Sequence, residues 1–440
     1  MKAPIKFIFW WYTRTMPKVI CDCGARLSAP DTLVGKLVKC PKCASPVRVP
    51  LVDAVEPELE LKPMSEPQVE PPAVAAPTRS PSVRPSVAAS RRPLPPKAPP
   101  TPTWKIYARW ALGIALLPLF LSLFTRDNPG ERLKHMIETD PKLQAKIAKL
   151  EEDKNASEED LFEVLPEHKI EGAFVGRSSK IHWFFAAVSA AAFWLFLLLV
   201  YPMGNASSKG LWTVGVFTGT AGILLLLGVQ LAAGFSQGMW LHGRSIVVIF
   251  FYIVKFIGFS YRAALDPENG FILSMLGFTF GVGLCEELCK LIPLIWHYKR
   301  QAKLDLPGAV VWGLASGIGF GVSEGITYSS DHYNGVMGGE IYVVRFVSCV
   351  ALHAIWNGFS ATLLWRFQAE LDGIDTWYDW FLPLFKIAGI SMILHGLYDT
   401  ALKKDHEFIA LLTAVISFAA FFWLYERTKK DAPALTGATA

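Results

Sequence analysis

The sequence predicts an all-α polytopic membrane protein with about eight or nine transmembrane helices. Of its 440 residues, 52% are hydrophobic and 13% are aromatic, whereas only 18% are charged. These proportions differ from those of an ordinary soluble enzyme. Apolar stretches of bilayer-spanning length also recur from Trp104 onward. The net charge of +5 lies largely in loops beside these stretches, so the lipid bilayer is the expected partner and a nucleic acid is not.

Nine apolar stretches have about the length that a membrane-spanning helix requires. Between the first two, the run from Leu143 to Leu150 alternates apolar and charged residues at helical spacing, which predicts a small helical insertion. The nine stretches cover approximately residues 105–124, 181–201, 211–235, 245–261, 271–296, 307–328, 341–365, 380–402 and 407–425.

Four cysteines near the N-terminus are spaced like the ligands of one metal ion. Cys21 and Cys23 form one short knuckle, and Cys40 and Cys43 form another. Four thiolates suit a tetrahedral structural zinc ion, so we predict a small zinc ribbon, with two disulfides or uncoordinated thiols as the alternative. Zinc ligation requires reduced thiols, which favours the cytoplasm for this part of the chain.

A segment rich in proline separates this ribbon from the apolar part of the chain. Residues 51–103 hold nearly half of the chain's 30 prolines and cannot build a hydrophobic core, which predicts an extended, disordered linker. The predicted divisions are an N-terminal extension (1–16), a zinc-ribbon-like domain (17–50), the linker (51–103), a membrane-associated or transmembrane segment (104–124), a charged helical insertion (125–180), a transmembrane domain (181–425) and a tail (426–440).

Basic residues predict which ends of the helices face the cytoplasm. Clusters at 297–303 and 427–430 favour the cytoplasmic side. Nine crossings would then place the zinc ribbon outside, against the redox argument. We therefore expect the segment 105–124, which Pro118 interrupts, to lie in the interface or to re-enter the membrane.

Ionisable side chains recur within four consecutive apolar stretches. Each costs about 2.5 to 3.5 kcal/mol on insertion scales, so each requires an explanation. A single pair could be explained by mutual neutralisation or packing, but four successive helices indicate a shared functional site. Members of each pair lie four residues apart and therefore share one helical face. The pairs are Glu286 with Lys290, Phe320 with Glu324, His353 with Asn357 and His395 with Asp399, and Glu287 adjoins the first.

These motifs, EExxK, FxxxE, HxxxN and HxxxD in this order, resemble those of the PrsW family of intramembrane proteases. That family belongs with the CAAX-processing and bacteriocin-processing membrane proteases, and the resemblance covers roughly residues 180–425. It implies a membrane-tethered protein as substrate, since the founding member acts on an anti-sigma factor, and a location in the bacterial inner membrane. The redox argument places the ribbon on the cytoplasmic side of that membrane. The ribbon, linker and insertion lie outside the pattern and leave the substrate open.

Two mechanisms fit the candidate catalytic residues. In the first, a glutamate acts as general base on water, His395 or His353 assists, and Asn357 holds the oxyanion. In the second, both histidines and a glutamate bind zinc, whose bound water is the nucleophile. We favour the first because the sequence has no HExxH motif. The candidates are Glu286, Glu287, Glu324, His353, Asn357, His395 and Asp399, supported by Lys290.

The adjacent glutamates are expected to divide their roles. Glu286 is four residues before Lys290 and is expected to pair with it, which leaves Glu287 as the general base.

Two functions of other classes also remain open. One is an ion or metal transporter that uses a buried Glu, His and Asp relay, although no inverted repeat is visible. The other is a non-catalytic membrane adaptor.

Overall fold

The computed structural model describes two separate parts of the chain. Contacts divide it into one compact unit of residues Arg14–Pro100 and another of Met1–Thr13 with Thr101–Ala440. The predicted extension 1–16, the linker 51–103 and the last five residues of the tail lie outside the described residues. The described residues are 18–20, 23, 26–28, 37–40, 42–43, 45–48 and 109–435, the last range without 126–127, 154–155, 301–302, 373, 375 and 377.

The N-terminal unit contains two short antiparallel hairpins. Strands β1 (Lys18–Ile20) and β2 (Arg26–Ser28) form the first, with Val19 opposite Leu27. Strands β3 (Leu37–Lys39) and β4 (Pro46–Arg48) form the second, with Val38 opposite Val47. Cys23 lies between β1 and β2, and Cys40 and Cys43 lie between β3 and β4.

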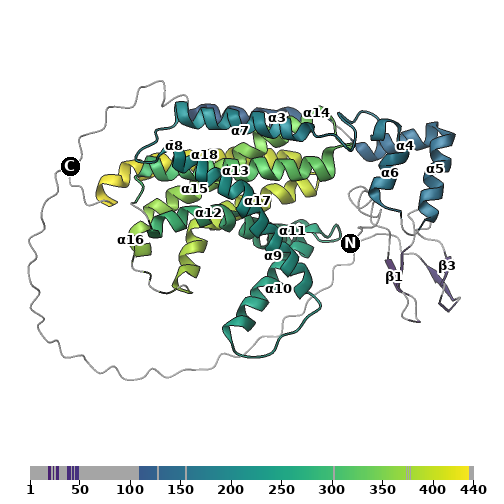
Figure 1. Cartoon of the computed structure of the whole chain (residues 1–440). Coiled ribbons are helices and arrows are strands. Elements are labelled where there is room, and N and C mark those ends of the chain that lie inside the picture. Colours follow the sequence, from purple (N-terminus) through teal and green to yellow (C-terminus); the bar gives the residue numbers. More distant parts are fainter. Residues whose placement is uncertain are drawn as a thin grey trace, which may run out of the picture. The chain divides into compact units, whose positions relative to one another are not determined.

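The second unit is built almost entirely from helices, and the predicted all-α polytopic fold is confirmed (Figure 1). Seven helices among the described residues are long and apolar enough to cross a membrane. They are α7 (Ile181–Val200), α8 to α9 (Ser208–Ser236), α10 (Ile246–Leu265), α11 to α12 (Phe271–Lys299), α13 with η6 (Leu306–Tyr333), α14 to α15 (Gly339–Arg366) and α18 (Glu407–Ala432).

Several of these long helices contain a π-helical turn, a feature that often occurs at functional sites. The helix α17 (Phe381–Lys403) has 23 residues, which is the length of a further span. The divided helices are α8 (Ser208–Phe217), η4 (Thr218–Gly222) and α9 (Ile223–Ser236); α11 (Phe271–Gly277), η5 (Phe278–Gly283) and α12 (Leu284–Arg300); α13 (Leu306–Tyr328) and η6 (Ser329–Tyr333); and α14 (Gly339–Val343), η7 (Val344–Cys349) and α15 (Val350–Arg366). The final helix, α18, extends over Glu407–Leu435.

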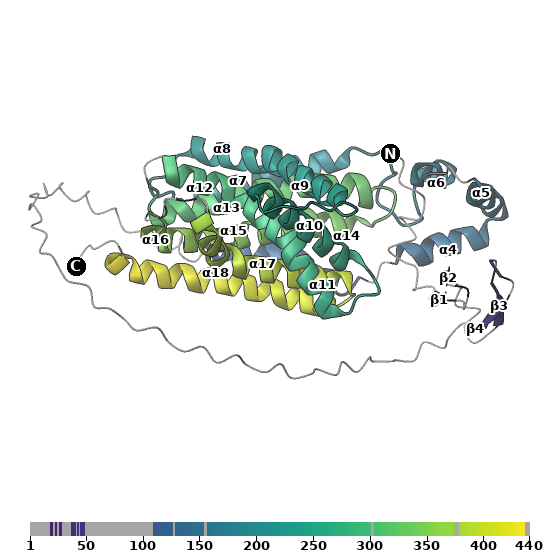
Figure 2. The same ribbon diagram turned by 90° about the horizontal axis from the view of Figure 1, so that it is seen from below.

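The helices α13 and α15 form the centre of the bundle, as the two views in Figures 1 and 2 show. In α15 with its preceding turns, 94% of the most apolar window is buried within the protein. Glycines allow this close packing. A Cβ atom at Gly317 would overlap the carbonyl oxygen of His353, and one at Gly321 would lie 3.0 Å from the Cα of Val350. Both glycines therefore bring α13 directly against the helix that carries His353.

Loop contacts define the two ends of the bundle. At one end, here called the Asp305 end, Asn205 N donates a hydrogen bond to Asp305 Oδ1 (3.1 Å). At the other, the Asn334 end, Asn334 Nδ2 donates to Ser179 O (2.7 Å). Because Ser179 precedes α7 and Asn205 follows it, α7 runs from the Asn334 end to the Asp305 end.

The helices α8 to α9 and α10 together carry the chain across the bundle once, not twice. α8 begins just after Asn205 at the Asp305 end. α10 leads to Asn269, whose carbonyl oxygen accepts from Lys404 Nζ just beyond the end of α17 (2.6 Å), and α11 to α12 runs from there to the Asp305 end. Between them, α9 and α10 pair as an antiparallel hairpin, in which Gln230 Nε2 donates to Tyr261 Oη (2.9 Å), and project from the neighbouring helices (Figure 1).

The segment from Arg109 to Thr125 runs along the bundle. Its helix Arg109–Ser122 is apolar but is not among the seven helices long enough to cross a membrane, so our expectation that the segment lies in the interface or re-enters stays a prediction. The guanidinium of Arg109 lies 5.8 Å from the centroid of the Tyr425 ring, in the second half of α18. At its other end, Thr125 borders the same cavity as Glu340, near the Asn334 end. The 3₁₀ helix η2 (Arg109–Leu116) rises about 2.0 Å per residue, so with α3 (Leu117–Ser122) it spans roughly 25 Å.

The charged insertion is helical, and it packs on the Asn334 end. Its helices begin at side-chain caps, and their apolar faces meet around Leu133 and Phe162. Arg132 Nη2 donates to Val336 O (2.9 Å), and Ile170 N donates to Gly335 O (2.8 Å). The helices are α4 (Pro129–Thr139), α5 (Pro141–Glu152) and α6 (Glu158–Val164), followed by η3 (Pro166–His168); the remaining short helices are α16 (Gln368–Asp372) and η8 (Tyr378–Trp380).

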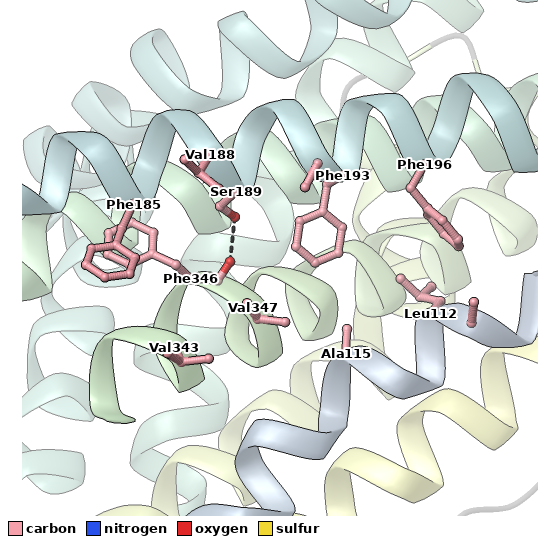
Figure 3. A pocket seen from close by; sticks show the side chains of 12 residues that line it. Leu112, Ala115, Phe185, Val188, Ser189, Phe193, Phe196, Val343, Phe346 and Val347 are labelled. Carbon is pink, nitrogen blue, oxygen red and sulfur yellow. Dashed lines mark hydrogen bonds between the residues drawn. The ribbon is translucent and has the colours of Figure 1, made fainter. Parts of the chain in front are cut away.

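An apolar groove lies between α7, η2, and α14 with η7 (Figure 3). Its cavity of about 360 Å³ is lined by side chains such as Phe193 and Val347. The hydroxyl of Ser189 on its wall is already used, since Ser189 Oγ donates to the carbonyl oxygen of Phe346 (2.5 Å). The groove therefore presents apolar surface, and its polar groups stabilise the π-helical turn η7.

Candidate active site

Four helices bring most of the predicted site residues into one buried cluster. Helix α12 supplies Glu286, Glu287 and Lys290 immediately after the π-helical turn η5, and α13 supplies Glu324. Helix α15 supplies His353, and α17 supplies His395 and Asp399. Side-chain exposure rises from 0% at Glu287 to 14% at Glu324 and 24% at Asp399. The cluster is therefore accessible from the edge where Glu324 and Asp399 lie.

Lys290 lies at the centre of the cluster and is fully buried. Its Nζ donates to Glu287 Oε1 (2.6 Å) and to His353 Nδ1 (2.9 Å), and it lies 4.7 Å from the centroid of the Phe320 ring. The nearest oxygen of Glu286 is 3.9 Å away. Lys290 therefore forms the expected i to i+4 ion pair with Glu286, but its i to i+3 contact with Glu287 is shorter.

His395 is oriented by contacts on both of its ring nitrogens. Nδ1 donates to Glu287 Oε1 (2.9 Å), so Glu287 binds both Lys290 and His395 through the same oxygen. Nε2 lies 3.4 Å from Asp399 Oδ2 and 3.6 Å from Glu286 Oε2. Glu287 thus bridges Lys290 and His395 through one oxygen, whereas its Oε2, like Glu286 Oε2, forms no hydrogen bond with any described residue. Glu286 makes only the longer ion-pair contacts with Lys290 and His395.

His353 is held between two charged groups of opposite sign. Its Nδ1 accepts from Lys290, and its Nε2 lies 2.5 Å from Glu324 Oε2. The other carboxylate oxygen of Glu324 lies 2.5 Å from Arg345 Nη2. An ordered path of polar contacts therefore leads from Arg345 through Glu324 and His353 to Lys290.

Asn357 is not part of this cluster of contacts. Its Nδ2 donates to the carbonyl oxygen of Gly313 (2.9 Å) on α13, and its side chain is fully buried between the two helices. The motif spacing placed it on the same face as His353, but the contact that it makes stabilises helix packing. The expected role of Asn357 in holding an oxyanion has no support from this geometry.

Two aromatic residues that sequence reasoning did not use also shape the site. The ring of Trp356 stacks on His395 with centroids 4.4 Å apart, and it meets His353 edge-on at 5.6 Å. Phe320, which the sequence identified only as the first residue of the FxxxE motif, lies against Lys290 and His353. A signal for Trp356 existed in its position three residues after His353, which puts it on nearly the same face.

The donor atoms of the cluster fit a divalent metal ion. Ligand atoms of Glu286, His353 and His395 all lie within 4.8 Å of one another. Two imidazoles with one glutamate form a known catalytic zinc set, and two ligands about 2.0 Å from a tetrahedral ion lie roughly 3.3 Å apart. The 3.6 Å between Glu286 Oε2 and His395 Nε2 is close to this value. A carboxylate on the second nitrogen of a ligand histidine, as Glu287 is on His395, is also typical of metal sites.

The charges of the cluster also favour a bound divalent metal ion. The four carboxylates of Glu286, Glu287, Glu324 and Asp399 face only two permanent cations, Lys290 and Arg345, which leaves an excess of negative charge. Buried charge without compensation is costly, so the remaining negative charge requires bound protons or a cation. A divalent ion would supply two positive charges beside Glu286 Oε2, which forms no hydrogen bond with a described residue.

A second group of possible metal ligands lies in the N-terminal unit. One sulfur each from Cys23, Cys40 and Cys43 lies within 4.8 Å of the others, and the sulfurs of Cys23 and Cys40 are 3.7 Å apart. Three thiols brought together by two hairpin turns fit a structural zinc ion. The fourth predicted ligand, Cys21, lies outside the described residues.

Comparison with known proteins identifies one part of the chain. Residues 230–425 match the family model described as PrsW family intramembrane metalloprotease. No curated protein and no solved structure matches the chain. The matched range includes all eight of the predicted site residues and leaves out the ribbon, the charged insertion and α7.

The pairing of Lys290 can be tested by double-mutant cycles on the free energy of unfolding in detergent. Combining Lys290→Met with Glu287→Gln should give a coupling energy of about 2–3 kcal/mol, because both partners are desolvated and in contact. Combining Lys290→Met with Glu286→Gln should give less than about 1 kcal/mol. The exposed pair of Lys386 and Glu370 (2.8 Å) is the matched control, with a coupling of about 0–1 kcal/mol. Equal coupling of Lys290 to both glutamates would contradict the assigned geometry.

Proposed function

Residues 230–425 belong to the PrsW family of intramembrane proteases, and on this premise we propose that the chain is an endopeptidase that cleaves membrane-tethered proteins. The observation that carries the proposal is the cluster of Glu286, His353 and His395, because these groups can activate a water molecule within the bilayer. The family resemblance suggests a regulator such as an anti-sigma factor as one class of substrate.

We assign the hydrolytic roles from the contacts of each side chain. Glu286, His395 and His353 would hold a divalent metal ion, His353 through a ring nitrogen that contacts Lys290 or Glu324 in this structure, and the ion would lower the pKa of water and polarise the scissile carbonyl. Asp399 is the most exposed carboxylate of the cluster and lies beside His395 Nε2, so it is placed to accept the proton of the attacking water. Glu287 and Lys290 orient the two histidines. This replaces the metal-free mechanism that the sequence favoured.

Cleavage can be followed by co-expression with candidate single-pass membrane proteins. Glu286→Gln and His395→Ala should each lower the rate of cleavage at least about 100-fold, because each removes a group that acts on the attacking water. Glu370→Gln changes the same kind of side chain on the exposed α16 and should leave the fragments unchanged. If the wild type and all three variants give identical fragments from every substrate, the protease proposal fails.

Zinc content distinguishes the two proposed metal sites. The full-length protein should contain about two zinc ions per chain, one in each site. A variant with Cys23→Ser, Cys40→Ser and Cys43→Ser should lose one ion and keep its cleavage activity. His395→Ala should lose the other ion together with activity. Elemental analysis of purified protein measures both, and an active preparation without metal would contradict the proposed mechanism.

The orientation that we propose places the Asp305 end in the cytoplasm of a bacterium, within the inner membrane. This end carries Lys299 and Lys303, and the C-terminal part of α18 lies there, as the contact of Arg366 with Asp431 (2.9 Å) indicates. Arg109 lies near this end as well, so the ribbon that precedes it would be cytoplasmic. The charged insertion would then face the exterior together with the Asn334 end.

Cysteine labelling tests this orientation in intact cells. A membrane-impermeant maleimide should label Lys149→Cys in the charged insertion, because α5 is exposed on the outer side. It should label Lys430→Cys only after lysis. The unmodified chain measures the background from its own cysteines. Labelling of Lys430→Cys in intact cells at the rate of Lys149→Cys would contradict the proposed orientation.

A further inference from the structure

Arg345 is a buried cation within the membrane-spanning part of the chain, and the family motifs do not include it. Its side chain is 11% exposed. A guanidinium cannot lose its charge in a protein, so it needs a partner wherever it is buried. Its Nη2 lies 2.5 Å from Glu324 Oε1, and its Cζ lies 4.0 Å from the centroid of the Tyr328 ring. These contacts hold the guanidinium plane between α13 and η7.

Glu324, which Arg345 holds in place, also contacts His353. One carboxylate oxygen of Glu324 faces Arg345, and the other faces His353 Nε2 at 2.5 Å. Because the two oxygens belong to one rigid carboxylate, the guanidinium sets the direction in which Glu324 meets the imidazole. We propose that Arg345 is a positioning residue that fixes Glu324 and, through it, the ring of His353. The inference rests on the proposed proteolytic function for its kinetic part only.

The π-helical turn that carries Arg345 is itself held by segments outside the family match. Ser189 Oγ on α7 donates to Phe346 O (2.5 Å), and this bond is drawn in Figure 3. Ser348 Oγ donates to Ala115 O (2.7 Å) and accepts from Leu119 N (3.2 Å). The additional N-terminal helices therefore stabilise the turn from which Arg345 reaches the site.

The first test uses Arg345→Met and Arg345→Lys in the full-length protein. Arg345→Met should lower kcat about 100-fold with little change in KM, because a displaced His353 affects reaction and not substrate binding. Arg345→Lys keeps the charge but not the planar fork and should recover part of this loss. Arg366→Met breaks a comparable pair with Asp431 at the Asp305 end, and it should leave kcat unchanged.

The second test does not depend on activity. The rate at which diethyl pyrocarbonate modifies His353, measured by mass spectrometry of the full-length protein, should rise several-fold in Arg345→Met. Glu324→Gln should give a similar rise, and the double variant should add nothing further, because Arg345 acts through Glu324. Arg345→Lys should be intermediate, which keeps the test valid if Arg345→Met does not fold. Arg366→Met should match the wild type.

The outcomes separate the two claims. Unchanged His353 modification in both Arg345 variants would overturn the positioning role, whatever the cleavage rates are. The expected modification pattern in a chain that cleaves no substrate would support the positioning role and count against the protease. If Arg345→Met and Arg366→Met lowered kcat by the same factor, the inference would also be overturned. A general loss of stability would then explain the loss of activity.

Discussion

The buried contact of Lys290 with Glu287 and His353 is the interaction on which the site depends. Its ammonium group is fully enclosed, so both partners must be present in the folded state. Through Glu287 it orients His395, and through His353 it connects to Glu324 and Arg345. One cation on α12 thereby fixes groups on three other helices in a medium where charges cannot be left alone.

This contact is possible only because the central helices pack closely. At Gly317 and Gly321 the backbone of α13 meets α15 directly, which brings Glu324 within reach of His353. The π-helical turns η5 and η7 precede the segments with Glu286 and His353. A π turn shifts the faces of the residues that follow it relative to those before it. Small residues and altered helical turns together therefore place side chains that simple periodicity could only assign to a common face.

The N-terminal additions surround this family core in different ways. The segment from Arg109 and α7 pack beside the π-helical turn η7, where Ser189 and Ala115 bond to its polar groups. The charged insertion binds the loop between α13 and α14 through Arg132. Both additions contact elements that carry Glu324 and Arg345. The core domain of this chain thus contacts parts that lie outside the residues matched by the family model.

The sequence alone determined the membrane class, the limits of most helices and seven of the residues that meet in the cluster. These follow from hydrophobic length and from the cost of buried charge, which act locally along the chain. Tertiary structure decided the partners. Lys290 lies closer to Glu287 than to Glu286, and Asn357 donates a hydrogen bond to Gly313. Trp356 contacts His395, and Arg345 contacts Glu324. It also decided that α9 and α10 form a hairpin with one net crossing, because packing between distant helices is not encoded in any single span.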